Sequence, residues 1–261
     1  SQPELVELIQ QKYLIKNTTG YAMNAFLDFH DPIDLLTHLL IGSEGTLGFI
    51  SEITYKTVRE HPFKSNALVF FESMETACLA VMELEKGPAK AIELMDELAL
   101  ISVEGQLPKG SCISKGGAAL LIDHHADTQE VLDQEIEQTF NTLESYGVES
   151  KFTVDDSAYA SLWKIRKGMF PSVAAMRKRG ETVIIEDIAF PLKDLAQATL
   201  ATQKLFLDYG YNDAIIFGHA RDGNLHVVFN QSFEATSEVD RYKKLMEALS
   251  NLVTVEYTGS L

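Results

Sequence analysis

The chain of 261 residues carries 38 acidic and 22 basic side chains, and its formal net charge of -16 disfavours a nucleic acid partner. Its two cysteines, Cys78 and Cys112, lie outside any CxxC pattern, so neither a disulfide framework nor a cysteine metal site is predicted. No apolar run reaches the length of a membrane span and the N-terminus lacks signal-peptide features, so we expect no membrane span and a cytoplasmic location.

Residues 1–60 form the first part of the chain. Their patterns predict a helix over residues 4–12, a polar turn over residues 16–21, a second helix over residues 34–40 and a strand over residues 53–58. A change in composition near residue 60 predicts a domain boundary at that point.

A glycine-rich loop joins the second predicted helix to the predicted strand. Gly42, Gly45 and Gly48 allow bare backbone N–H groups to approach a ligand, and Ser43 and Thr46 add hydroxyl donors. This pattern suits a cofactor, although it matches neither the P-loop nor the dinucleotide-binding fingerprint. An ordinary tight connection is the alternative interpretation.

Residues 61–261 alternate between strand and helix patterns. Strands are predicted over residues 67–71, 89–95, 118–123 and 182–190, and helices over residues 74–85, 96–103, 128–146, 155–167, 192–207 and 238–252. This rhythm predicts an α+β fold with one mixed or antiparallel sheet and helices on one face. Residues 255–261 look like a strand that has been cut artificially, and no internal repeat is visible in the sequence.

A hairpin is predicted where two apolar runs flank Asp222 and Gly223. A two-residue type I′ turn at this pair sets His219 directly opposite His226, with Cβ atoms about 4.5–5.5 Å apart on one face. Two imidazoles at that distance can share a divalent cation. The alternative is a plain hairpin with half-exposed histidines, because two ligands rarely suffice for a metal site.

His124 and His125 end a predicted strand. Adjacent strand residues point to opposite faces, so these two side chains cannot serve one site, and a surface role is favoured over metal binding.

A basic stretch lies between residues 164 and 180. Within a strongly acidic chain it contains no acidic residue, and its cations are Lys164, Arg166, Lys167, Arg177, Lys178 and Arg179. Such a stretch can attract an anionic substrate, since guanidinium and carboxylate groups match in bidentate geometry. A solvated helix face is the competing interpretation.

Three motifs resemble a known family. Residues 218–226 resemble the G-H-x-G-D-G-N-x-H motif of FAD-linked oxidases of the vanillyl-alcohol oxidase type, in particular D-lactate, glycolate and D-2-hydroxyglutarate dehydrogenases. Residues 41–48 resemble their G-S-E-G-T-L-G segment, and residues 162–166 resemble their L-W-x-x-R segment. Arg221 stands where the family usually has glycine. The sequences of residues 16–21 and 161–171 resemble those of large bacterial members that also carry an iron–sulfur region.

The resemblance implies roles for particular residues. His219 and His226 would ligate a divalent metal, with zinc as the implied ion, and Arg166 would pair with a substrate carboxylate. FAD would be bordered by Gly42, Ser43, Gly45 and Thr46.

The resemblance also implies an organisation. Residues 61–261 would form a ferredoxin-like substrate cap that is truncated at its C-terminus, and residues 1–60 would be the end of a flavin-binding domain. The pyrophosphate-binding half would precede Ser1, and an E-H-G segment with the third metal ligand and a catalytic base would follow Leu261. Any iron–sulfur cluster would also lie in a missing region. We therefore expect this chain alone to be colourless and inactive.

The implied function is that of a flavoprotein oxidoreductase. It would oxidise a small anionic D-2-hydroxy acid, either D-2-hydroxyglutarate or D-lactate, to the 2-oxo acid. The alternatives are a divalent-metal hydrolase and a non-catalytic metal-binding α+β domain. The hydrolase is disfavoured because no glutamate lies at H-E-x-x-H spacing from either hairpin histidine. The particular hydroxy acid, the electron acceptor and assembly as a homo-oligomer stay open.

Overall fold

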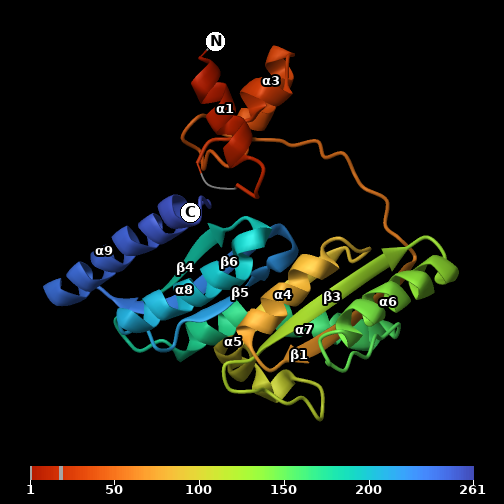
Figure 1. Cartoon of the computed structure of the whole chain (residues 1–261). Helices are drawn as coiled ribbons and strands as arrows, with labels where there is room; N and C mark the ends of the chain where they lie inside the picture. The colour runs from red at the N-terminus through yellow and green to blue at the C-terminus, as the bar shows by residue number, and fades with distance from the viewer. Residues whose placement is uncertain (1, 18–19) are drawn as a thin grey trace.

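The computed structural model describes residues 2–17 and 20–261 of the chain. The chain forms a small helical unit at its N-terminus, an extended connection, and a larger layer of strands and helices (Figure 1). Residues 18 and 19 of the predicted polar turn lie outside the described residues.

The N-terminal unit contains α1 (Pro3–Lys12), α2 (Ala25–Asp28) and α3 (Pro32–Leu39), which confirms both predicted helices. Proline occupies the first turn of α1 and α3, where its missing N–H is not needed. Asp31 caps α3, because its carboxylate accepts the backbone N–H groups of Ile33 and Asp34.

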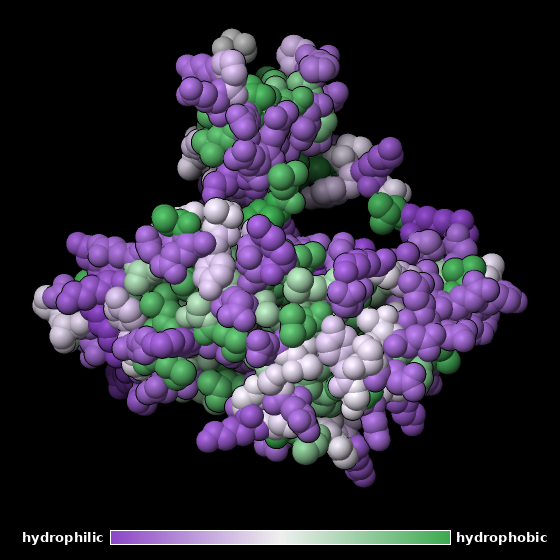
Figure 2. Space-filling view, viewed as in Figure 1, coloured by the Kyte–Doolittle hydropathy of each residue, from purple (hydrophilic) through white to green (hydrophobic). Residues whose placement is uncertain are grey.

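The extended connection follows this unit. Residues 49–60 form neither helix nor strand, so the strand predicted over residues 53–58 is wrong. A strand requires backbone partners on a neighbouring strand, and this segment runs clear of the sheet (Figure 1). Its apolar side chains are exposed, with Phe49 and Val58 both at 92%. Hydrophobic residues also lie on the surface of the N-terminal unit (Figure 2).

The larger layer contains one antiparallel sheet of six strands in the order β1-β3-β2-β5-β6-β4. The strands are β1 (Phe63–Phe71), β2 (Ala91–Asp96), β3 (Ala118–Ala126), β4 (Glu181–Ala189), β5 (Ile215–His219) and β6 (Asn224–Ser232). The first three strands and the last three repeat one arrangement, in which the last strand of each half lies between the other two. The two halves meet where β2 pairs with β5. The topology thus repeats although the sequence shows no repeat.

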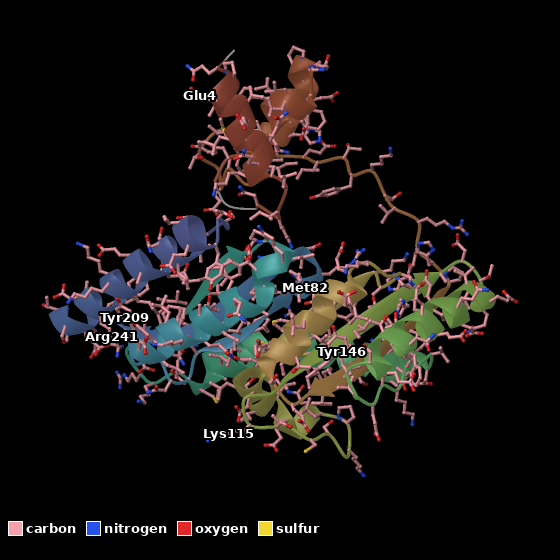
Figure 3. All side chains as sticks on the ribbon, in the orientation of Figure 1. Glu4, Met82, Lys115, Tyr146, Tyr209 and Arg241 are labelled. Carbon is pink, nitrogen blue, oxygen red and sulfur yellow. The ribbon has the colours of Figure 1, made fainter. Side chains whose placement is uncertain are left out.

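Helices cover both faces of this sheet. One face is buried under α4 (Met74–Leu84), α6 (Gln129–Glu144), α8 (Leu195–Asp208) and α9 (Thr236–Asn251). Tyr146, just after α6, donates a hydrogen bond to the carbonyl of Leu79 and so joins α6 to α4 (Figure 3). The other face packs against α5 (Glu97–Ser102) and α7 (Asp156–Met176). The predicted α+β class is confirmed, and α7 adds a helix to the face that was expected to be open.

Several segments differ from their predicted form. The helix predicted to end at residue 167 continues to Met176, although it contains Pro171. The predicted strand over residues 255–261 is wrong: η4 (Leu252–Glu256) is a π-helical turn, and Ser260 alone in this run pairs with Ala189 in the described structure. Short 3-10 turns occupy three connections, namely η1 (Glu104–Gln106), η2 (Leu192–Asp194) and η3 (Ala220–Asp222). Among the described residues, no helix has the length and apolarity needed to cross a bilayer.

A buried carboxylate strengthens the seam between the two halves of the sheet. Strands β2 and β5 pair over residues 93–95 and 217–219. Beyond these pairs, Asp96 accepts the backbone N–H of Ile216 at 2.9 Å and that of Ala99 at 2.8 Å, which caps α5. Burial raises the pKa of Asp96 to about 7 despite these hydrogen bonds. The position of β5 therefore depends partly on one side chain.

Asp96 should make the stability of the chain depend on pH. Its pKa of about 7 in the folded state exceeds its ordinary value of 3.8, so the folded state binds the proton more tightly between these values. The free energy of unfolding should fall as pH rises from the lower value to the higher, by at most about 1.4 kcal/mol per pH unit. Urea unfolding of wild type and Asp96→Asn across this range measures the effect, because the variant lacks this titration.

Asp155 provides a control of opposite sign. It caps α7 from an exposed position, and hydrogen bonds from Ser157 and Ala158 lower its pKa. Its contribution to the free energy of unfolding is present at neutral pH and is lost as pH falls through the lowered pKa. Asp155→Asn should therefore lower the free energy of unfolding near neutral pH but not at pH values below that pKa. Parallel profiles for wild type and Asp96→Asn would contradict the prediction for Asp96.

Candidate functional site

The hairpin that carries the two histidines has a longer turn than predicted. Residues 220–222 form η3, and Gly223 closes the turn at a φ of 68°. His219 therefore pairs with Asn224, and His226 pairs with Phe217, so the predicted direct pairing of the two histidines is wrong. The turn is longer by two residues, which preserves the side on which each residue points. The imidazoles still lie on one face, with ring centroids 5.3 Å apart.

Two glycines make this turn and its strands fit. A Cβ at Gly223 would lie 2.1 Å from the carbonyl oxygen of Phe190, and its φ is one that L side chains rarely adopt. A Cβ at Gly218 would lie 2.5 Å from the carbonyl oxygen of Asn224. Neither position has room for a side chain. This explains why glycine stands both directly before His219 and at the end of the turn that follows it.

Each imidazole contacts a carboxylate on the neighbouring strand. Nδ1 of His219 lies 2.7 Å from Oε1 of Glu93 in β2, and Nδ1 of His226 lies 3.0 Å from Oδ1 of Asp187 in β4. A carboxylate can only accept, so each Nδ1 carries a proton, and in the neutral form of each ring Nε2 has the lone pair. Asn224 donates to Asp187 at 2.7 Å and holds that carboxylate in place.

Arg166 reaches the same place from α7. Its Nε donates to Oε2 of Glu93 at 2.7 Å, and its guanidinium carbon lies 4.5 Å from the ring centroid of Phe217. The Arg166 side chain is 10% exposed and that of Glu93 is 4% exposed, whereas that of His219 is 40% exposed. The site therefore opens to solvent mainly at His219 and is closed around the guanidinium.

Glu93 stays ionised in this setting. Burial raises the pKa of its carboxyl, but the hydrogen bond from His219 and the charge of Arg166 outweigh burial and hold the pKa below its ordinary value of 4.5. The carboxylate thus compensates the buried guanidinium at neutral pH.

The structure brings together three of the predicted site residues, namely Arg166, His219 and His226. The glycine-rich loop belongs to the N-terminal unit and joins none of these contacts. That unit meets the hairpin side of the sheet through two lysines: Nζ of Lys12 donates to the carbonyl of Gly259 at 3.1 Å, and Nζ of Lys16 lies 4.0 Å from Asp222.

Within the glycine-rich loop the hydroxyls are already engaged. Ser43 donates to the carbonyl of Leu40 at 2.8 Å, and Thr46 donates to the carbonyl of Ser43 at 2.6 Å. Gly42 and Gly45 adopt φ values of 77° and 79°. A Cβ at Gly45 would meet no atom within 4 Å, so the backbone there is open to a ligand. What this loop offers a cofactor is bare backbone, not the two hydroxyls.

The basic stretch does not act as a unit. Arg166 faces inward, whereas the other cations of this stretch are exposed, namely Lys164, Lys167, Arg177, Lys178 and Arg179. The solvated-face interpretation therefore holds for all of it except Arg166.

The adjacent histidines of β3 lie on opposite faces, as predicted, but the surface role predicted for them is wrong for His124, which is fully buried. His124 is buried and lies 3.1 Å from the hydroxyl of Thr139 in α6, whereas His125 lies 3.1 Å from the hydroxyl of Tyr159 in α7.

Sequence reasoning missed Glu93 and gave Asp187 no role. Glu93 interrupts an apolar strand, and a charged residue in such a run is rarely buried without a partner. That signal points to a buried ion pair but names no partner. In residues 2–17 and 20–261, no group of three or more His, Cys, Asp and Glu side chains is arranged to hold a metal ion.

Comparison with known proteins gives a consistent match. Residues 60–261 match the family described as "FAD linked oxidases, C-terminal domain". The glycolate oxidase subunit GlcD of Bacillus subtilis is 28% identical over 213 residues, 80% of this chain and 44% of that protein. The mitochondrial D-lactate dehydrogenase (cytochrome) of Arabidopsis thaliana is 30% identical over 212 residues, 79% of this chain and 35% of that protein. The chain thus spans less than half the length of these relatives.

Solved structures share the fold. A structure of alkyldihydroxyacetonephosphate synthase superposes with a TM-score of 0.59 at 16% identity, over 86% of this chain and 44% of that chain. At this identity the likeness concerns the arrangement of strands and helices.

The hairpin turn should be intolerant of any side chain at Gly223. Gly223→Ala adds both an unfavourable φ and a collision with the Phe190 carbonyl, so it should cost more than about 3 kcal/mol of the free energy of unfolding. Gly210→Ala is the matched control, since Gly210 has a φ of 81° and its nearest atom would be the end of the Arg241 side chain at 3.9 Å. It should cost about 1 kcal/mol. If urea unfolding shows the same loss of free energy for Gly223→Ala and Gly210→Ala, the predicted collision with Phe190 is contradicted.

Proposed function

Because this chain belongs to the family of FAD-linked oxidases, C-terminal domain, we propose that it is the substrate-binding part of an oxidoreductase that converts a D-2-hydroxy acid to the 2-oxo acid. The observation that carries the proposal is the placement of a buried guanidinium beside two imidazoles on one face of the sheet. A 2-hydroxy acid has a carboxylate and a hydroxyl on adjacent carbons, and these groups need a cation and a basic atom close together.

Arg166 is proposed to bind the substrate carboxylate. Its Nε is taken by Glu93, but a guanidinium carries five N–H donors, and the two terminal nitrogens can pair end-on with a second carboxylate. Because the side chain is largely buried, that pairing would be less screened by water than a surface ion pair. Glu93 cancels the charge of Arg166 without occupying this end of the guanidinium.

His219 and His226 are proposed to act on the substrate hydroxyl. With both Nδ1 protons held by carboxylates, both Nε2 lone pairs are available to accept a proton or to ligate a divalent metal such as zinc. These residues fit two positions of a metal site, and a third ligand would come from outside the described residues. Such a metal, when bound, lowers the pKa of the hydroxyl that it contacts.

FAD is proposed as the oxidant, with Gly42, Ser43, Gly45 and Thr46 at its border. When bound, FAD would supply the two-electron oxidant for the α-carbon, and the hydroxyl proton would have to pass to a base. This chain would contribute two contacts to the orientation, the carboxylate on Arg166 and the hydroxyl toward Nε2, and the position of the hydride acceptor would be the third point that determines which hydrogen-bearing face can react. That fixed orientation favours one enantiomer, for which we propose the D form.

We propose residues 1–60 as the end of a flavin-binding domain and residues 61–261 as the substrate cap. The exposed apolar side chains along the extended connection support this division, since they favour burial against another part of a protein. Any iron–sulfur cluster would be held elsewhere, because this chain has only the buried Cys78 and the exposed Cys112, and both are free. A cytoplasmic location is proposed on the same unpaired thiols.

The hydrolase alternative receives less support. In metal hydrolases of the H-E-x-x-H type, a glutamate faces the attacking water as general base. Here Glu93 and Asp187 face the Nδ1 atoms of the two histidines, where they orient the rings. The geometry therefore favours substrate orientation over activation of water.

Arg166→Lys tests the proposed function in the full-length flavin-containing protein. Lysine keeps the charge but loses the fork, so KM for D-lactate or D-2-hydroxyglutarate should rise and kcat/KM should fall at least tenfold, which is about 1.4 kcal/mol. Steady-state kinetics with an artificial electron acceptor measure this, and flavin absorbance should be unchanged.

Lys167→Ala is the matched control, because Lys167 is the next residue of α7 and faces solvent. It should leave kcat/KM unchanged. Wild-type kinetics in Arg166→Lys would remove the proposed anchor, and a parallel loss of flavin would make the role of Arg166 structural.

A further inference from the structure

One carboxylate serves both halves of the site. Oε2 of Glu93 accepts from Nε of Arg166 and Oε1 accepts from Nδ1 of His219, each at 2.7 Å. We propose that Glu93 is a positioning residue that orients Arg166 for the substrate carboxylate and His219 for the substrate hydroxyl. The inference rests on the proposed function but concerns a residue that no sequence motif indicated.

The backbone fixes Glu93 in this place. Glu93 is the pairing partner of His219 across the seam of the sheet, and its neighbour Met95 pairs with Phe217, the residue on which the guanidinium stacks. Glu93 and Met95 are 3% and 1% exposed, so neither side chain has room for another arrangement. The strand therefore places the carboxylate between Arg166 and His219.

The hydrogen-bond pattern requires two acceptors at this position. A guanidinium has no lone pair, so the group beside Nε of Arg166 must be an acceptor. His219 keeps its Nε2 lone pair only if Nδ1 donates, so the group beside Nδ1 must be an acceptor as well. Among ionised and amide side chains of this length, glutamate meets both conditions and glutamine meets one.

Glu93→Gln should therefore reverse the tautomer of His219. The amide oxygen has to face Arg166, which leaves the amide NH₂ against Nδ1 of His219. Nδ1 must then accept, and the proton moves to Nε2. The ring stays in place but loses the lone pair that would meet a hydroxyl or a metal ion.

The decisive measurement is nitrogen NMR of the 261-residue chain with labelled histidine rings, at a pH where the imidazoles are neutral. Wild type should show His219 as the Nδ1–H tautomer and Glu93→Gln should show it as the Nε2–H tautomer, with the signal assigned by its loss in His219→Ala. Glu135→Gln is the matched control, because Glu135 lies 3.5 Å from the buried His124 on the other face of the sheet. It should leave His219 unchanged.

Zinc titration by calorimetry gives a second reading. Wild type should bind Zn²⁺ weakly, His226→Ala should abolish binding, and Glu93→Gln should weaken it at least tenfold. If wild type does not bind zinc, the proposed metal site is contradicted but the proposed role of Glu93 is not, since the tautomer of His219 is measured without metal.

The proposal is overturned if wild-type His219 is already the Nε2–H tautomer, or if Glu93→Gln keeps the Nδ1–H tautomer. The wild-type reading does not depend on Glu93→Gln, so it holds if that variant fails to fold.

Discussion

The contact of Glu93 with Arg166 and His219 joins three parts of the chain that are far apart in sequence. Glu93 belongs to the first half of the sheet, His219 to the second half, and Arg166 to the helix that connects the halves. Burial of an ion pair costs several kcal/mol per charge, which only well-placed partners offset. Removal of one partner of such a pair typically costs about 3–5 kcal/mol. The candidate site therefore lies at the seam where the two halves of the sheet meet.

This location explains why the site has a closed side and an open side. The guanidinium lies between α7 and the ring of Phe217, where little water reaches it, while the histidines lie at the strand ends beside the turn. In the proposed function, a substrate anion would approach from the exposed side of His219 and pair with the terminal nitrogens of Arg166. A net charge of -16 opposes an anion at long range, and Glu93 compensates the charge of Arg166, so recognition of a carboxylate would depend on the short-range geometry of the remaining guanidinium N–H donors.

The sequence allowed much of the fold to be predicted where local pattern decides it, as in α1, α4 and β3. It failed for residues 53–58, because apolar alternation predicts a strand without stating whether a partner strand is present. His219 and His226 lie on one face of the sheet although the predicted turn was too short. The error was two residues, and a register shift of two residues leaves each side chain on the same face. Arg166 became a candidate through its motif, and the structure places it beside His219 through Glu93. The role of Glu93 could not be found, since its partners lie 73 and 126 residues away.

A crystal structure of the full-length protein with a bound 2-oxo acid tests the central claim most directly. The account predicts that the carboxylate pairs with the two terminal nitrogens of Arg166, that Nε of Arg166 remains on Glu93, and that the 2-oxo oxygen lies toward Nε2 of His219 and His226 or a metal ion between them. An acid bound elsewhere, with Arg166 still enclosed by Glu93 and Phe217 and making no contact to it, would contradict the account.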